Sequence, residues 1–304
     1  MWLDRSFRVM NTGIAAWLQT DDTRRGNRAL DAVERFFLEA EWRLSRFRSD
    51  SEISTLNRER RIQPSRMLLD LLRRADAMRR ASEGVFNALS GASVIAAGYD
   101  RTFDEIGPGT TLRLPLAAPP PPTHALSLAF HADGAVSLPE GALLDLGGIA
   151  KGWAADRSAT FLGRLGPACV DAGGDIRVAG AWPDGAGFTI DVEDPFRPES
   201  ALQILSLSGG GVATSGIGRR WWRAGGEMRH HLIDPRTGQP ADNDLLSVTV
   251  QADTTVEAEV AAKTAFILGE AAGRDWLAAR GMAAVFVMRN GAWSSDFRDT
   301  LLVR

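Results

Sequence analysis

The chain has 304 residues, enough for one large domain or two ordinary ones, and 44% of them are hydrophobic, so a sizeable core can form. Its 38 acidic and 35 basic residues are mixed along the sequence and give a net charge of −3. The sequence therefore lacks the concentrated positive charge that is typical of nucleic-acid-binding proteins. Cys169 is the only cysteine, so an intramolecular disulfide and a cysteine metal cluster are excluded, and we expect a buried thiol. None of the 4 histidines has the helical spacing of a paired zinc-ligand set.

Residues 1–10 contain no apolar signal-peptide core, and no later segment is long and apolar enough to span a bilayer. We therefore expect a globular, soluble, cytoplasmic protein without a membrane span.

The first part of the chain predicts a strand followed by a long helix. Residues 7–18 mix β-branched, aromatic and small residues and predict a strand that bends near Gly13. Apolar residues recur at helical spacing over 28–47, which predicts an amphipathic core helix. The polar link 49–57 could begin a short helical turn at Ser51, or its side chains could face a ligand.

A second amphipathic helix is predicted over 65–82, ending at Glu83 and Gly84, and residues 85–87 follow as a short apolar hook. The Pro-rich run near 115–123 cannot be helical and predicts an extended surface connection. Because the strands after it look continuous with the same sheet, we expect a single domain over 1–304.

The second half of the chain predicts short strands mixed with helices. A hairpin is expected around the Asp-Gly turn at 131–134. The other expected elements are strands at 168–170, 175–178, 188–193, 202–207, 246–251 and 283–288, helices at 257–269 and near 274–280, and a last strand pair joined at 290–291. Because strands and helices do not alternate strictly, an α+β fold is favoured over a doubly wound sheet.

Residues 144–156, LDLGGIAKGWAAD, run from an apolar strand end through two glycines into a helix. The glycines let a ligand approach the backbone, and the helix start offers unpaired N–H donors, so this turn suits an anion. Lys151 lies on its first turn, and Lys151 and Lys263 are the only lysines in a chain whose other basic residues are arginines. A compact ammonium fits a crowded phosphate site better than a planar guanidinium does. An ordinary strand-to-helix turn with a surface lysine remains the alternative.

Glycines or hydroxyl residues also gather in turns at 145–151, 171–175, 209–216 and 231–238, each beside a short strand. Nucleotide clefts are often assembled in this way. None of these turns fits a Walker loop or a G-x-G-x-x-G fingerprint, so neither a P-loop nor a Rossmann fold is supported.

Five segments resemble, in order and spacing, the motifs of the ApbE family of FAD:protein FMN transferases. They are SEISTLN at 51–57, LDLGGIAKGWAAD at 144–156, DAGGD at 171–175, VATSG at 212–216 and HLIDPRTG at 231–238. The similarity runs over about residues 10–269. It implies an ApbE-like, T-fold-related mixed sheet with flanking helices.

The resemblance also implies an activity. Members of this family bind FAD and, with Mg²⁺, move its FMN half onto a threonine hydroxyl of an acceptor flavoprotein, releasing AMP. The expected partners are therefore FAD and a protein with a threonine-containing motif. Splitting a pyrophosphate requires neutralised charge on the phosphate oxygens and an aligned attacking oxygen, which explains the kinds of residue that the motifs contain.

By resemblance, the catalytic residues are Lys151, on the phosphates, with Glu259, Lys263 and His231. The implied FAD contacts are Met10, Phe47, Asn57, Val85, Phe86, Asn87, Asp145, Lys151, Thr214, Ser215, Ile233 and Asp234. Thr214 and Ser215 could instead hold their turn together. The implied metal ligands are the Gly148 carbonyl and Glu259.

The sequence departs from the family pattern at the metal site. Where the family has an aspartate and, four residues on, a threonine, this chain has Glu259 and Lys263, which share a helix face. Glutamate can bind magnesium, but an ammonium group cannot, and Lys263 could instead replace the cation beside the phosphates. Asn87, where the family usually has aspartate, removes one more negative charge.

Three hypotheses follow from this departure. The chain is an active FMN transferase with an altered metal site, a non-catalytic FAD-binding or flavin-storing protein with Lys263 in place of magnesium, or a scaffold that uses the fold for protein contacts. The first is preferred because the motifs on the FAD side are kept, and the third leaves Lys151 unexplained.

Overall fold

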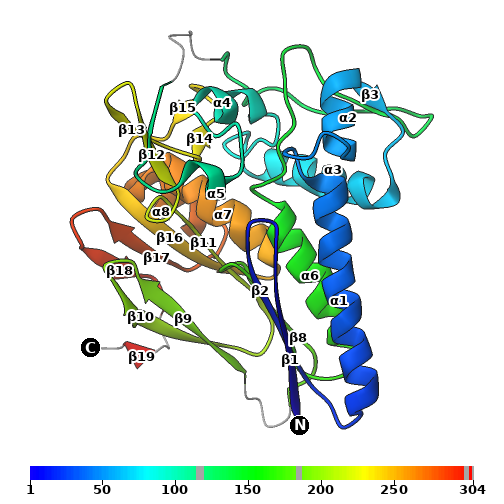
Figure 1. Ribbon diagram of the computed structural model, residues 1–304. Helices are drawn as coiled ribbons and strands as arrows, with labels where there is room; N and C mark the ends of the chain where they lie inside the picture. The colour runs from blue at the N-terminus through cyan, green and yellow to red at the C-terminus, as the bar shows by residue number, and fades with distance from the viewer. Residues whose placement is uncertain (114–119, 183–186, 298–300, 303–304) are drawn as a thin grey trace.

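A computed structural model describes residues 1–113, 120–182, 187–297 and 301–302 (Figure 1). Its largest element is an eight-stranded sheet in the order β1-β2-β7-β8-β11-β16-β17-β18, and all its neighbouring strands are antiparallel. The strands are β1 (Trp2–Val9), β2 (Thr12–Gln19), β7 (Ala168–Ala172), β8 (Ile176–Ala179), β11 (Gly210–Gly216), β16 (Leu245–Ala252), β17 (Ala284–Met288) and β18 (Trp293–Ser295). Strands that precede and follow the Pro-rich segment therefore share one sheet.

Helices cover one face of this sheet, and part of a second sheet covers the other. α1 (Thr23–Leu44) contacts β1, α6 (Ala150–Leu162) contacts β7 and β8, and α7 (Thr255–Leu268) contacts β11 and β16. The second sheet has the order β19-β10-β9, with β9 (Phe188–Asp194), β10 (Arg197–Leu207) and β19 (Leu301–Leu302). Side chains alternate along β7, so Ala168 and Val170 pack with the helices whereas Cys169 packs with β9 and β10. The expected α+β class and the buried thiol are both confirmed.

Most of the remaining elements are short, the 16-residue helix α3 being an exception, and lie at one end of the large sheet (Figure 1). They are α2 (Glu52–Glu59), β3 (Arg61–Ile62), α3 (Arg66–Ala81), α4 (Gly91–Ala96), α5 (Phe103–Ile106), β4 (Thr111–Leu112), β5 (Ala129–Phe130), β6 (Val136–Ser137), β12 (Trp221–Ala224), β13 (Glu227–His230), β14 (Ile233–Asp234) and β15 (Gln239–Pro240), with α8 (Glu270–Ala278) following α7. A parallel strand pair, β4 with β12, occurs in one of the small sheets that these strands form.

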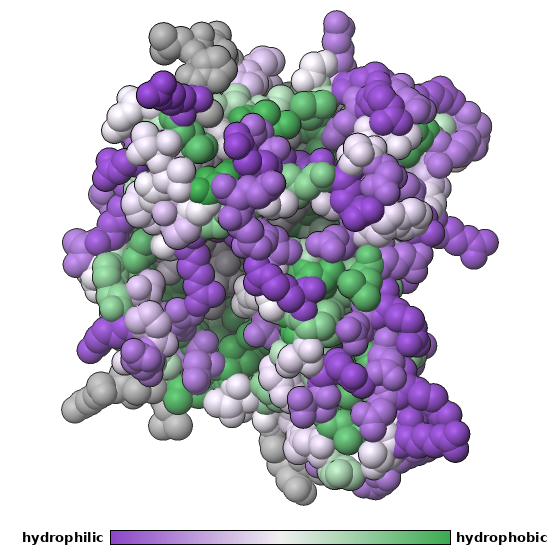
Figure 2. All heavy atoms as spheres, in the orientation of Figure 1, coloured by the Kyte–Doolittle hydropathy of each residue, from purple (hydrophilic) through white to green (hydrophobic). Residues whose placement is uncertain are grey.

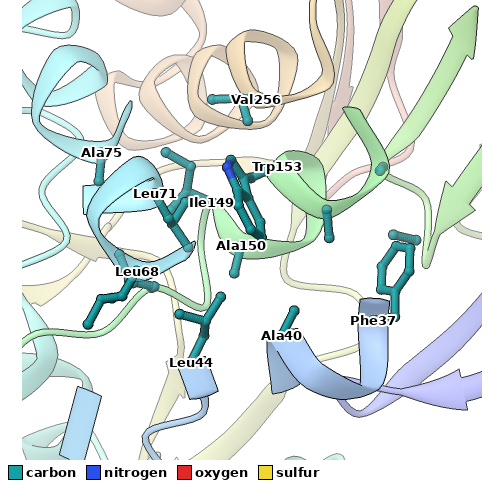
Figure 3. Packing of buried hydrophobic residues seen from close by; sticks show 14 of the residues in the cluster. Phe37, Ala40, Leu44, Leu68, Leu71, Ala75, Ile149, Ala150, Trp153 and Val256 are labelled. Carbon is teal, nitrogen blue, oxygen red and sulfur yellow. The ribbon is translucent and has the colours of Figure 1, made fainter. Parts of the chain in front are cut away.

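Trp153 of α6 fills the space between α1, α3 and α7 (Figure 3). Its side chain packs near Leu71 of α3 and Val256 of α7, and the residue is 4% exposed. The indole N–H donates to Asp70 Oδ2 at 2.7 Å, so the polar edge of this large ring is satisfied while its apolar body is buried. The packing fixes the first turns of α6, which also carry Lys151.

The predicted long helices are confirmed, with shifted ends. α1 begins at Thr23 because Asp22 caps it, and α1 ends at Leu44 before the predicted end at residue 47. α3 spans Arg66–Ala81, close to the predicted 65–82. Ser51 caps α2 by accepting from the Ser54 N–H at 3.1 Å, so the short helical turn predicted there is confirmed.

Two local predictions were wrong. Residues 7–18 are not one strand that bends near Gly13 but parts of the hairpin β1–β2, whose turn residues Met10 and Asn11 both have positive φ, 53° and 57°. This left-handed pair matches the twist of the flanking strands, as two-residue hairpin turns require. Residues 210–216 are not a turn but strand β11, in the middle of the large sheet.

The predicted Pro-rich connection is only partly described, because residues 115–119 lie outside the described ranges. Pro121 and Pro122 are exposed and belong to no helix or strand, and the chain is anchored directly after them. Thr123 is 4% exposed, and its N–H donates to the Pro235 carbonyl at 2.7 Å. Among the helices of the described residues, none has the length and apolar character to cross a membrane.

Gly211 lies where β11 crosses the start of α7. A Cβ at this position would lie 2.4 Å from the backbone N of Thr255 and 2.5 Å from its Cα. Gly211→Ala must push strand and helix apart, and we expect urea denaturation to show a free energy of unfolding lower by about 1–3 kcal/mol. Gly209→Ala is the matched control, because its Cβ would meet no atom within 4 Å. Equal losses in the two variants would contradict this account.

Candidate active site

A cavity of about 520 Å³ opens between the large sheet, the β1–β2 turn and the short elements at the end of the sheet. Its lining comes from segments far apart in the sequence, including 46–47, 85–88, 145–151, β11 and α7. Figure 2 shows that this face of the molecule is hollowed and that hydrophilic residues gather around the hollow. The volume is in the usual range for sites that hold small molecules or cofactors.

The turn before α6 forms one wall of the cavity and is held by hydrogen bonds. Asn57 Oδ1 accepts from the Leu144 N–H at 2.7 Å, and Asn57 Nδ2 donates to the Leu144 carbonyl at 3.0 Å. Asp145 Oδ1 accepts from the Gly147 N–H at 2.8 Å. The backbone that leads into α6 is therefore fixed before any ligand binds, and Lys151 on the first turn of α6 lines the cavity.

Two lysines and two carboxylates meet in the cavity wall. Lys151 Nζ forms an ion pair with Asp175 Oδ2 and lies 3.4 Å from Glu259 Oε1. Glu259 Oε2 accepts from the Gly152 N–H at 3.0 Å. The Asp175 and Glu259 side chains are only 3% and 5% exposed, so neither carboxylate could stay charged here without a cation beside it.

Burial shapes the titration of this group. Burial, together with the Glu259 carboxylate, raises the pKa of Asp175 to about 7, although Lys151 opposes the shift. Burial acts to lower the pKa of Lys151, but Asp175 and Glu259 reverse its effect and the net shift is upward. For Lys263 burial prevails over Glu259 and lowers the pKa. Lys151 is thus held as an ammonium ion, and the charge of Lys263 is favoured by any further negative group that enters the cavity.

The predicted metal ligands do not fit a divalent cation. Lys263 Nζ donates to the Gly148 carbonyl at 2.6 Å, so the cation beside this oxygen is an ammonium group. Both oxygens of Glu259 are engaged as well, by Lys151 and by the Gly152 N–H. An ammonium group cannot coordinate a metal ion and repels one. In the described ranges no group of three or more His, Cys, Asp or Glu residues could hold a metal.

His231 lines the same cavity from the link between β13 and β14. Burial, and then the positive charge of Arg220, lowers the pKa of His231 well below 6.5. Its Nδ1 is buried without a hydrogen-bond partner among the residues that the structure describes. A neutral imidazole with the proton on Nε2 can accept a hydrogen bond or a proton at Nδ1 from a ligand hydroxyl.

Aromatic rings and one arginine form another part of the lining. The Arg46 guanidinium lies 4.1 Å from the ring centroid of Phe47 and 5.0 Å from that of Tyr99. Arg46 Nε also donates to Asp145 Oδ2 at 2.8 Å, which connects this group to the turn before α6. Planar rings next to a fixed guanidinium suit an aromatic ligand.

Most of the residues expected at the site line this cavity. They are Phe47, Val85, Phe86, Asn87, Asp145, Gly148, Lys151, Thr214, Ser215, His231, Ile233, Glu259 and Lys263. Met10, Asn57 and Asp234 are not part of the lining. The Met10 N–H donates to Glu41, Asn57 holds the turn as described above, and Asp234 pairs with Arg236, so the structure gives these three a contact within the protein instead.

Three of the lining residues, Thr214, Ser215 and Asn87, also make contacts within the protein. Thr214 and Ser215 stand on a central strand, where Thr214 Oγ1 lies 2.8 Å from Thr249 Oγ1. The Asn87 amide donates to the carbonyls of Thr123 at 2.6 Å and Leu126 at 3.0 Å. An ionised aspartate could not make these two hydrogen bonds, because it has no donor.

Sequence reasoning missed Asp175, Arg46, Tyr99 and Arg220 as site residues, although all four line the cavity. A signal existed for Asp175, which ends the DAGGD segment and is a carboxylate directly after two glycines. No local pattern sets Arg46 or Arg220 apart from the other arginines of the chain. Their positions depend on how distant segments pack.

Comparisons with known proteins find relatives of this chain both by sequence and by structure. A sequence model described as ApbE family matches residues 10–286. A protein named FAD:protein FMN transferase from Treponema pallidum is 31% identical over 269 residues, which cover 79% of this chain and 71% of the relative. One with the same name from Salmonella typhimurium is 28% identical over 276 residues, or 86% of this chain and 79% of the relative.

Solved structures have the same architecture. The crystal structure of the ApbE protein from Thermotoga maritima matches with a TM-score of 0.83 and 22% identity over 97% of both chains. The apo form of the flavinyl transferase ApbE from Pseudomonas stutzeri matches with a TM-score of 0.80 and 25% identity, over 97% of this chain and 94% of the other. Because the family match runs from the β1–β2 turn to β17 and includes every segment named in the cavity wall, this chain belongs to the ApbE family.

Proposed function

We propose that this protein is a FAD:protein FMN transferase, which moves FMN from FAD to a threonine hydroxyl of an acceptor protein and releases AMP. The observation that carries the proposal is the meeting of Lys151, Lys263 and His231 in one cavity of an ApbE-family chain. The names of the Treponema pallidum and Salmonella typhimurium relatives support the same activity.

FAD contains a flavin ring and a pyrophosphate, and the cavity has a counterpart for each of these two parts. Phe47 and Tyr99 provide aromatic surface, and Phe47 is where the family resemblance expects the flavin. Lys151 and Lys263 provide compact positive charge for the pyrophosphate, close to the glycine turn before α6. We therefore place the flavin beside the aromatic group and the pyrophosphate over the two lysines.

The chemistry is a phosphoryl-type transfer without a covalent enzyme intermediate. The threonine oxygen attacks the phosphorus of the FMN half, the bond from that phosphorus to the bridging oxygen breaks, and the electron pair leaves with AMP. The proton of the hydroxyl goes to the neutral His231, whose Nδ1 is free to take it. Lys151 stabilises the charge that develops on the phosphate oxygens. No step here uses a divalent cation, because Lys263 already stands at the Gly148 carbonyl.

A direct assay tests this function. Purified protein is incubated with FAD and with an acceptor protein that carries the threonine motif, and AMP and the flavinylated acceptor are measured. We expect both products in equal amounts, and neither when the acceptor threonine is replaced by valine, which keeps the shape but lacks the nucleophile. Bound intact FAD without AMP would instead indicate a flavin-storing protein, and no flavin binding would indicate a scaffold.

The role of His231 is tested separately. His231→Asn removes the proton acceptor, and we expect transfer to slow by about 10²–10⁴-fold while FAD still binds, as measured by quenching of flavin fluorescence. His124→Asn is the control, because His124 is exposed and outside the cavity. Since the pKa of His231 lies well below 6.5, the loss of rate that comes from protonating this base should appear only when the pH drops through that low value. Transfer by His231→Asn at the wild-type rate would exclude this role.

A further inference from the structure

Lys263 is an unexpected residue for its helix. Eleven of the fourteen residues of α7 are buried, and Lys263 is the only basic residue among the fourteen. Of the 35 basic residues in the chain, only Lys151 and Lys263 are lysines, and both line the same cavity. This cavity therefore holds the two compact cations of a chain that otherwise uses arginine.

The ammonium group of Lys263 is held in a defined place. Nζ donates to the Gly148 carbonyl at 2.6 Å and lies 5.6 Å from the ring centroid of Phe86, with which it makes a cation–π contact. An ammonium group has three N–H donors, and Gly148 takes one of them. The described part of the chain supplies no further hydrogen-bond acceptor to Lys263, so two donors remain for the oxygens of a ligand.

The charges around Lys263 balance before a ligand binds. Lys151 and Lys263 carry two positive charges, and Asp175 and Glu259 carry two negative ones when all four are ionised. A pyrophosphate brings two further negative charges, and its oxygens can accept hydrogen bonds from the two lysines. Arg220, which also lines the cavity, adds positive charge. A divalent cation, in contrast, would have to sit against the ammonium group on the same carbonyl oxygen.

We propose that Lys263 takes the place of the divalent cation of this reaction, so that the protein transfers FMN from FAD without a metal. The inference rests on the proposed function and specifies how the pyrophosphate is neutralised. Nζ of Lys263 hydrogen-bonds a phosphate oxygen while Gly148 holds it in position. The bonds formed and broken are those of the transfer described above, and Lys263 gains and loses no atom in it.

Metal dependence is the first test. The full chain is freed of metal with a chelator and assayed for AMP release with FAD and acceptor, with the chelator present and then with excess Mg²⁺. We expect about the same rate in both. AMP release only with Mg²⁺ would overturn the inference while leaving the proposed transferase function intact. The absence of AMP in both conditions would instead overturn the transferase function.

A binding measurement tests Lys263 independently of turnover. With chelator present, Lys263→Met should weaken FAD binding by about 10- to 100-fold, the loss that follows from removing one hydrogen bond to a charged group. Arg164→Met is the control, because it removes one positive charge from an exposed position outside the cavity. Unchanged FAD affinity in Lys263→Met would overturn the inference whether or not the protein is a transferase.

A second variant covers the case that Lys263→Met fails to fold. A Cβ on Gly148 would lie 2.0 Å from Lys263 Nζ, so Gly148→Ala must displace the ammonium group, which is the far end of a flexible side chain. We expect weaker FAD binding in chelator from this variant too. Wild-type affinity in Gly148→Ala would count against the assigned position of Lys263.

Restoring the family pattern should restore a metal site. In the double variant Glu259→Asp with Lys263→Thr, the ammonium is gone and two oxygen ligands stand one helical turn apart beside the Gly148 carbonyl. We expect electron paramagnetic resonance to detect Mn²⁺ binding to the double variant but not to the wild type. Mn²⁺ binding to the wild type with equal affinity would overturn the inference.

Discussion

The close contact of α6 with α7 at Gly152 determines where the charged groups of the cavity lie. The Gly152 N–H donates to Glu259, and a Cβ on Gly152 would lie 2.8 Å from that carboxylate oxygen. Asp156, one turn further along α6, accepts from the first two N–H groups of α7 at 2.8 and 3.0 Å and so caps it. Lys151 is next to Gly152, and Lys263 is one turn beyond Glu259, so two contacts between helices bring both lysines to one cavity wall.

Local sequence patterns correctly predicted the elements whose formation depends on neighbouring residues in the chain. Helical periodicity gave α1 and α3, and the glycine turn with Lys151 was identified because a helix start and two glycines are adjacent in the sequence. The Met10–Asn11 turn was missed because neither residue is glycine and the nearby Gly13 is the stronger local signal. β11 was taken for a turn because of its glycines. Gly211 is in fact needed because the backbone of α7 passes so close that no side chain fits.

The site was harder to predict than the fold because its geometry is set by packing. Lys263 could be placed near the metal position only through the family resemblance, since an isolated lysine in an apolar helix has no local explanation. Its hydrogen bond to Gly148 joins residues 115 positions apart. Exchanging a metal for an ammonium group also changes how a phosphate is bound at the site. A metal imposes a coordination geometry and can dissociate, whereas a lysine is covalently part of the chain and offers directional N–H donors.

The scarcity of lysine gives the molecule one more property. Apart from the amine of its first residue, its primary amines are Lys151 and Lys263, and both face the cavity. Acylating or aldehyde reagents, which label the surface lysines of most proteins indiscriminately, would here find side-chain amines only at the site. The lowered pKa of Lys263 leaves a larger share of it as the free, nucleophilic base in the absence of ligand. Covalent probes for side-chain amines would therefore react at the proposed FAD site.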